Sequence, residues 1–181
     1  PHREWIHRQA YQMGRHVIGY EVQKVLAGVD WFVHDMEDKG ADGTCTIGVA
    51  GYGEGGLVAL YSAAIDPRID AALVSGYFGP REGLWQEPIY RNVWSLLTEF
   101  GDAEIAAMVA PRSLVIEYSR APEIDGPPPA RTGRSGAAPG QITTPTLEQV
   151  QAEYERALAL VGESMGKSLH LVHGPDGALV E

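Results

Sequence analysis

The chain has 181 residues, enough for one domain, and its 44% hydrophobic and 21% charged residues are typical of a folded chain with a buried core. Its net charge of −10 argues against nucleic acid and anionic membrane surfaces as partners, because no cluster of basic residues offsets the acidic excess. No apolar run has the length of a transmembrane segment, and the sequence shows no signal-peptide pattern.

The predicted elements alternate between helices and strands. In chain order they are a helix over 19–36, a strand over 45–50, a helix over 55–65, a strand over 71–75, short helices over 92–100 and 102–109, a strand over 113–118, a long helix over 146–165 and a strand over 168–173. This alternation predicts an α/β fold, with a parallel sheet and helices on both of its faces. The strands are short and apolar, as in sheets that are covered on both faces.

Residues 120–145 interrupt this alternation. They hold six of the twelve prolines, and their arginines include Arg131 and Arg134. A loop of this length within a compact domain is usually functional or disordered. We therefore expect a flap near the functional site, with a plain flexible excursion as the alternative.

The two ends of the chain suggest a piece of a longer protein. The sequence begins at Pro1 without a methionine, at what resembles the approach to a helix, and ends just after a strand-like run. We therefore interpret residues 1–181 as a single partial domain whose native N-terminus is missing. The sequence predicts neither the compartment nor the oligomeric state.

The chain contains one cysteine, Cys45, which excludes an intramolecular disulfide and any metal site built from several cysteines. Cys45 lies in a strand-like run, which favours a buried and inert thiol. The six histidines show no ligand spacing such as H-E-x-x-H. We therefore expect no metal and no other cofactor.

The stretch GVAGYGEGGLVAL, residues 48–60, fits two motifs with different chemistry. As G-x-G-x-x-G, with Gly51, Gly53 and Gly56, it is a dinucleotide-binding loop. As G-x-Nuc-x-G, with Gly51 and Gly55 as its flanks, it is the nucleophile elbow of an α/β-hydrolase. In the second case Gly53 occupies the position of the nucleophile and has no side chain that could attack. Both motifs need a strand before the glycines and a helix after them, and the sequence predicts both.

The rest of the sequence favours the elbow. A dinucleotide site needs an acidic residue at the end of the next strand, but that strand ends with residues 74–77, VSGY, and Asp66 and Asp70 precede it. An elbow turn needs small flanking residues, and Gly56 would let the helix pack close to the strand. The backbone N–H of Glu54 would then form half of an oxyanion hole.

Three runs of the sequence resemble one group of hydrolases. IGVAGYGEGGLVALYSAAIDPRIDAALVSGYF resembles the core of α/β-hydrolases of the acetyl xylan esterase and dienelactone hydrolase-like group, which often have G-Y-S-E-G-G at the elbow. GRHVIGYEVQKVLAGVDWF is similar to the helix before that elbow, and DAEIAAMVAPRSLVIEYS to the stretch before the acid-bearing strand. The resemblance covers most of residues 14–120 and, more loosely, 146–174.

This resemblance implies an α/β-hydrolase fold of which the chain holds the C-terminal half. The N-terminal strands that precede the elbow in that fold are absent from the chain, as is the loop that supplies the second oxyanion-hole N–H. The catalytic acid should follow the strand over 113–118, where Glu123 is closest and Asp125 and Glu117 are alternatives. Pro122 stands where an aspartate is common in such hydrolases. An ordinary exposed loop carboxylate is the other interpretation of Glu123.

The catalytic histidine should follow the last strand, and His173 is well placed for this role. His170 lies within the strand and on a different face from His173. The alternative for His173 is a histidine at a strand end that hydrogen bonds to the backbone. Ser75 and Ser119 also end strands, but neither has the sequence context of an elbow.

Several other polar and aromatic residues are candidates for binding a substrate. We expect Tyr52, Tyr77 and Trp85 to contact it. The loop that could cap an apolar or sugar-binding cleft, or else pack as core and lid, carries Tyr77, Phe78, Trp85, Tyr90 and Trp94. A second set near the first long helix could line a pocket or form a salt-bridged helix start, and it consists of Arg15, His16 and Glu21. The Glu54 carboxylate could act as a base on water, or simply stabilise the helix N-terminus.

Three functions follow from these features. The first is a protein of carboxylic-ester hydrolase lineage that is impaired as a serine esterase because Gly53 replaces the nucleophile. The second is a non-catalytic module that binds a small-molecule ester or a carbohydrate. The third, less favoured, is an oxidoreductase that binds a dinucleotide through Gly51, Gly53 and Gly56.

Overall fold

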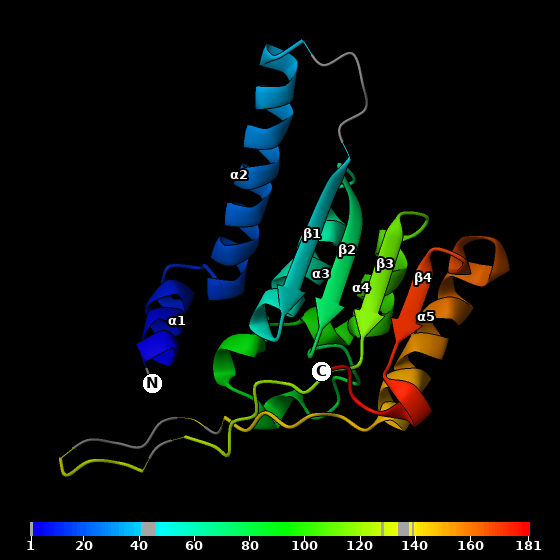
Figure 1. The fold of residues 1–181 in the computed structure, drawn as a ribbon. Coiled ribbons are helices and arrows are strands. Elements are labelled where there is room, and N and C mark those ends of the chain that lie inside the picture. Colours follow the sequence, from blue (N-terminus) through cyan, green and yellow to red (C-terminus); the bar gives the residue numbers. More distant parts are fainter. Residues whose placement is uncertain (1, 41–45, 128, 134–137, 139) are drawn as a thin grey trace.

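The computed structural model describes residues 2–40, 46–127, 129–133, 138 and 140–181. Four parallel strands form one sheet in the order β1-β2-β3-β4, which is also their order in the sequence (Figure 1). The strands are β1 (Ile47–Tyr52), β2 (Ile69–Ser75), β3 (Ser113–Glu117) and β4 (Leu169–Val172). The predicted α/β class with a parallel sheet is therefore confirmed.

Five α-helices accompany the sheet in the described part of the chain. They are α1 (His2–Gln12), α2 (Val17–Asp38), α3 (Glu54–Ile65), α4 (Asp102–Val109) and α5 (Leu147–Gly166). Short 3₁₀ turns occur at η1 (Leu84–Gln86), η2 (Ile89–Arg91), η3 (Leu96–Thr98) and η4 (Pro175–Gly177). The helices that correspond to α2, α3, α4 and α5 were predicted, whereas the sequence showed only the approach to a helix where α1 lies.

The predicted helix over 92–100 is wrong. Only the 3₁₀ turn η3 forms there, because Ser95 adopts a left-handed backbone conformation with φ of 64°. An α-helix cannot continue through such a residue. The segment from Tyr77 to Phe100 is instead a series of short turns that crosses the carboxyl end of the sheet region (Figure 1).

The crossover helices cover one face of the sheet, not two. Helix α3 packs on β1 and β2, α4 packs on β3, and α5 packs on β4, all on the same side (Figure 1). The opposite face is open in the described part of the chain, where it exposes Ala50 and His170 and leaves Leu73, in register between them, partly exposed. The reason is topological. Right-handed crossovers between strands that are sequential neighbours all place their helices on the same face.

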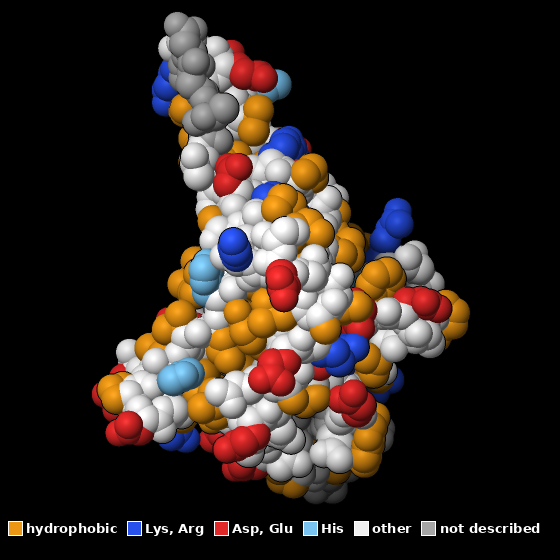
Figure 2. Space-filling model, turned by 90° about the vertical axis from the view of Figure 1, so that its right-hand side faces the viewer, with side chains coloured by type: hydrophobic (Ala, Val, Ile, Leu, Met, Phe, Trp, Pro, Cys, Tyr) orange, Lys and Arg blue, Asp and Glu red, His pale blue; other side chains and the backbone are white. Residues whose placement is uncertain are grey.

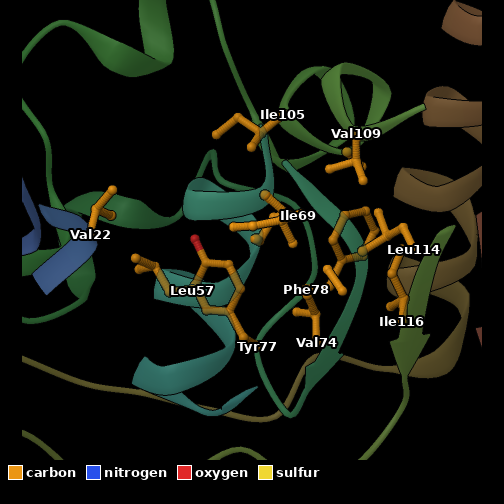
Figure 3. Close-up of a cluster of buried hydrophobic side chains, with 14 of the residues drawn as sticks. Val22, Leu57, Ile69, Val74, Tyr77, Phe78, Ile105, Val109, Leu114 and Ile116 are labelled. Carbon is orange, nitrogen blue, oxygen red and sulfur yellow. The ribbon is translucent and has the colours of Figure 1, made fainter. Parts of the chain in front are cut away.

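One hydrophobic core lies between this covered face and the helices. Leu57 and Leu60 of α3 are almost fully buried, as are Val74, Leu114 and Ile116 of the sheet. Figure 3 shows Tyr77 and Phe78, which follow β2, in the same cluster. The carboxyl end of β2 is therefore anchored by apolar packing, and this fixes the edge of the sheet where the glycine-rich turn lies.

The start of α2 is capped by a histidine. His16 adopts an extended conformation at the N-cap, and its Nδ1 accepts a hydrogen bond from the Ile18 N–H at 3.1 Å. Its Nε2 lies 3.1 Å from the Asn92 carbonyl oxygen, which fixes the neutral tautomer with the proton on Nε2. His16 therefore lies at a helix start, but hydrogen bonds hold it there in place of the predicted salt bridge.

This cap predicts a pH-dependent stability. Burial lowers the pKa of His16 below its ordinary value of 6.5, so its contribution is present above pH 6.5 and is lost as the pH falls through the lowered pKa. We expect His16→Ala to lower the free energy of unfolding by about 1 kcal/mol at pH 7.5. His16→Asn keeps an acceptor at the cap, so it should retain most of that stability and depend less on pH. Urea unfolding at pH 7.5 and pH 5 measures both effects. Equal pH dependence of the natural chain and His16→Asn would contradict the assignment.

Candidate functional site

A sharp turn joins the end of β1 to the start of α3. Its central residue is Gly53, with φ of 56° and ψ of −118°, a conformation that residues with side chains rarely adopt. The Gly53 N–H donates a hydrogen bond to the Ser75 carbonyl oxygen at 2.9 Å, which ties the turn to the end of β2. A strained residue between a strand and a helix at the carboxyl edge of a parallel sheet is the geometry that a nucleophile elbow requires.

The neighbouring glycines explain how the turn can be so tight. A Cβ atom on Gly51 would lie 2.0 Å from the Gly55 carbonyl oxygen, so only glycine fits there. A Cβ atom on Gly56 would lie 3.0 Å from the Ser75 carbonyl oxygen, which shows how closely α3 approaches β2. A Cβ atom on Gly55 would meet nothing within 4 Å. The steric demand therefore falls on Gly51 and Gly56, and not on Gly55.

The space next to Gly53 is occupied by a proline. A Cβ atom built on Gly53 would lie 2.6 Å from Cγ and 2.9 Å from Cδ of Pro122. Both distances are well inside van der Waals contact, and the closed ring of proline has little freedom to move aside. The ring of Pro122 thus takes the place that the side chain of a nucleophile would need.

Hydrogen bonds on the upstream side hold Pro122 in this place. Residue 122 follows β3 by five positions, and Ser119 Oγ lies 2.6 Å from Ser75 Oγ at the end of the neighbouring strand. The Tyr52 hydroxyl, at the end of β1, donates to the Arg120 carbonyl oxygen at 2.8 Å. Tyr52, a predicted substrate-binding residue, is exposed, and its hydrogen bond connects the end of β1 to the loop that contains Pro122.

Residues on both sides of Pro122 also form hydrogen bonds to residues near the end of the segment 120–145. The Ala121 N–H donates to Thr144 Oγ1 at 3.1 Å, and Ile124 and Ile142 exchange two backbone hydrogen bonds of 3.0 and 2.9 Å. Thr144 Oγ1 donates to the Glu123 carboxylate at 2.7 Å. This hydrogen bond, followed by one from the Thr144 N–H, lowers the pKa of Glu123. The two ends of the segment 120–145 therefore lie side by side, close to the turn at Gly53.

The predicted acid and histidine do not meet in this structure. His173 is exposed directly after β4, and its Nδ1 lies 2.8 Å from the Gly174 carbonyl oxygen. Within the described part of the chain, no hydrogen bond joins His173 to Glu123 or to the elbow. Strands β1 and β4 lie at opposite edges of the sheet, roughly 14 Å apart for three strand spacings. A catalytic contact would need the loop after β4 to reach across that distance.

Glu54 is the first residue of α3, and its side chain points into a charge network. It forms an ion pair with Arg91, which is buried, and a weaker one of 3.4 Å with Arg3 of α1. Arg3 also binds Glu21 of α2, as a bidentate pair of 2.6 and 2.7 Å. The Glu54 carboxylate is therefore occupied by arginines. Its backbone N–H, in the first turn of the helix, has no hydrogen-bond partner among the described residues.

A cavity of about 410 Å³ lies next to the elbow, at the carboxyl end of β2. Its walls come from residues 76–91 on one side and from Ala121 and 141–145 on the other. Tyr77, a predicted substrate-binding residue, is among the lining residues, and its side chain is largely buried. Arg81 and Arg91 also line it, and Arg91 Nη2 is buried without a hydrogen-bond partner in the described structure.

Neither these two arginines nor Asp102, the buried partner of Arg81, was predicted from the sequence. Asp102 is fully buried at the start of α4 and accepts hydrogen bonds from the Tyr77 hydroxyl at 3.1 Å and the Gly79 N–H at 3.2 Å. Arg81 Nε lies 3.5 Å from the same carboxylate. No local pattern identifies an isolated arginine or aspartate as buried. The only indication of structure in this part of the sequence was the pair of prolines, Pro80 and Pro88, in the loop after β2.

The predicted aromatic loop divides into two groups. Tyr77, Phe78 and Tyr90 are buried and belong to the core, which favours the packing interpretation for them. Trp85 and Trp94 are exposed, at 72% and 77% of their surface. Trp85 does not line the cavity beside the elbow, so the structure does not bring it to the other predicted substrate-binding residues.

The described residues contain no cluster of histidine, cysteine or acidic side chains that could hold a metal ion. None of the described helices is both long and apolar enough to cross a membrane. On the face drawn in Figure 2, basic side chains are scattered among acidic ones and do not form one patch. The predicted buried thiol of Cys45 lies outside the described residues.

The chain matches no protein-family model, and a search of curated proteins gives no significant match. The geometry of the turn at Gly53 and the cavity beside it therefore carry the functional interpretation on their own.

Proposed function

We propose that this protein is a non-hydrolytic relative of the α/β-hydrolases, of carboxylic-ester hydrolase lineage, which binds a small molecule beside its elbow without cleaving it. The observation that carries the proposal is the pairing of Gly53 with Pro122. The turn has the strained conformation of an elbow, but the nucleophile is absent and a proline ring fills its place. An elbow without a nucleophile cannot form the covalent intermediate on which fast ester hydrolysis depends.

The remaining chemistry of the site also favours binding over catalysis. Water could attack an ester only if a base activated it, but the Glu54 carboxylate is paired with Arg91 and Arg3. Glu123 is held by Thr144, and His173 bonds to its own loop. The cavity itself is well formed, with a volume in the range of small-molecule sites and with tyrosine and arginine side chains in its walls. We expect its ligand to be a small polar molecule with oxygen acceptors for Arg91.

Hydrolysis of phenyl acetate tests this proposal. We expect phenyl acetate to be hydrolysed no faster in the presence of the natural chain than in buffer. In an NMR titration, we expect intact phenyl acetate to shift the amide resonances of Gly76, Tyr77 and Gln141. Gly53→Ser alone should stay inactive because Pro122 blocks the new side chain. Turnover by the natural chain that His173→Ala abolishes would contradict the proposal, since it would show a working catalytic histidine.

A further inference from the structure

A second cavity, of about 440 Å³, lies between α1 and the segment 89–94, which begins with η2. Helix α1 contributes His7, Arg8, Tyr11 and Gln12 to its walls, and the segment contributes Ile89, Asn92 and Trp94. It shares no described lining residue with the cavity beside the elbow. Its volume falls in the range of small-molecule sites, and it is separate from the proposed function of the elbow region.

The wall of this cavity contains a buried imidazole without a partner. His7 is only 5% exposed, and its Nδ1 is buried without a hydrogen bond in the described structure. Buried polar atoms are nearly always paired, so an unpaired one needs an explanation. Burial lowers the pKa of His7, and the neighbouring His16 and Arg8 lower it further. A neutral imidazole offers one donor and one acceptor, and a hydroxyl group can satisfy either.

The other side chains suit a molecule that is polar at its edges and apolar on its face. Trp94 and Tyr11 expose 77% and 56% of their surfaces and present flat rings at the cavity. Gln12 and Asn92 carry amides, which both donate and accept hydrogen bonds. Arg8 is bound by the Glu4 carboxylate through two hydrogen bonds of 2.9 and 2.7 Å. Its charge is therefore compensated within α1, and the site has no excess positive charge for an anion.

We propose that this cavity binds a neutral pyranose sugar. Aromatic rings pack against the apolar C–H face of such a sugar, and amides and a neutral imidazole pair with its ring of hydroxyl groups. The proposal rests on the combination of a formed cavity, exposed aromatic rings, amide groups and the unpaired His7, and not on any one of them alone.

Calorimetric titration of the whole chain with D-glucose, D-galactose, D-mannose and D-xylose tests the proposal. We expect saturable binding of at least one of these sugars, weakened at least tenfold by Trp94→Ala. Trp85→Ala is the matched control, because Trp85 is equally exposed but lines neither cavity. It should leave the affinity unchanged. Gln12→Ala, at the exposed end of α1, serves as a second variant if Trp94→Ala disturbs the circular dichroism spectrum.

Two results would overturn this inference. One is the absence of saturable binding for all four sugars. The other is an equal loss of affinity in Trp85→Ala and Trp94→Ala. Binding of D-glucuronate that is tighter than that of every neutral sugar would overturn the assignment of a neutral ligand, because it would show that Arg8 is available to an anion. None of these results depends on the elbow, so the two proposals can fail separately.

Discussion

Gly53→Ser should destabilise the protein by about 2–6 kcal/mol, although serine is the residue that an active elbow would carry. Two costs add. The backbone of residue 53 has φ of 56°, and holding a residue with a side chain in such a conformation costs about 1–3 kcal/mol. The new Cβ atom would also lie 2.6 Å from the ring of Pro122, and forcing atoms into a packed site costs about 1–3 kcal/mol. Urea unfolding with a linear extrapolation measures the sum.

The same motif offers a matched control. Gly55→Ser introduces the same side chain two residues later, where a Cβ atom would meet nothing within 4 Å. Serine is a better helix former than glycine, so this variant should be as stable as the natural chain or slightly more stable. A loss in Gly53→Ser no larger than that in Gly55→Ser would show that Pro122 does not occupy the site.

A double-mutant cycle separates the two costs at Gly53. Pro122→Ala removes Cγ and Cδ, the two atoms that clash, and leaves Cβ at a distance of 3.8 Å. Gly53→Ser/Pro122→Ala should therefore regain the part of the stability that the clash removes, while the backbone strain remains. We expect a coupling free energy of about 1–3 kcal/mol between the two positions. Strict additivity would refute the contact.

The tight glycine turn between β1 and α3 and the parallel sheet could be predicted because their signals are local. Short apolar strands, the helix start at Thr146 and the dense glycines at 51–56 are patterns within a few residues. The contact between Gly53 and Pro122 could not be predicted in the same way, since 69 positions separate the two residues. The sequence indicated only that Pro122 stands where hydrolases of this group often have an aspartate. The structure adds that the proline lies against the elbow.

Two other features were missed for physical reasons. Helix α1 buries Glu4, His7 and Ala10, so its inner face lacks the apolar residues by which amphipathic helices are recognised. Apolar strands favoured a sheet with helices on both faces. The composition of a strand does not reveal, however, in which order the strands are connected. Sequential right-handed crossovers left one face open, and residues such as Ala50 and Leu73 suit either environment.

Asp102→Ala should destabilise the protein by about 3–5 kcal/mol, as expected when one partner of a buried ion pair is removed. The change would remove a fully buried carboxylate, so that the Tyr77 hydroxyl and the Gly79 N–H lose their acceptor and Arg81 keeps only Glu87 as a nearby carboxylate. Asp102→Asn keeps an oxygen for the Gly79 N–H but loses the charge. Its stability should lie between those of Asp102→Ala and the natural chain, and the difference between the two variants estimates what the polar contacts contribute.

The exposed Asp125 provides the control for this prediction. It makes no side-chain hydrogen bond among the described residues, so Asp125→Ala should change the free energy of unfolding by less than about 0.5 kcal/mol. Because Asp102 fixes Tyr77 and Arg81, which both line the cavity beside the elbow, Asp102→Asn should also weaken the phenyl acetate-induced shifts at Gly76 and Tyr77. A loss of stability below 1 kcal/mol in Asp102→Ala would show that water reaches this carboxylate, and the cavity would then lack the rigid wall that a binding site needs.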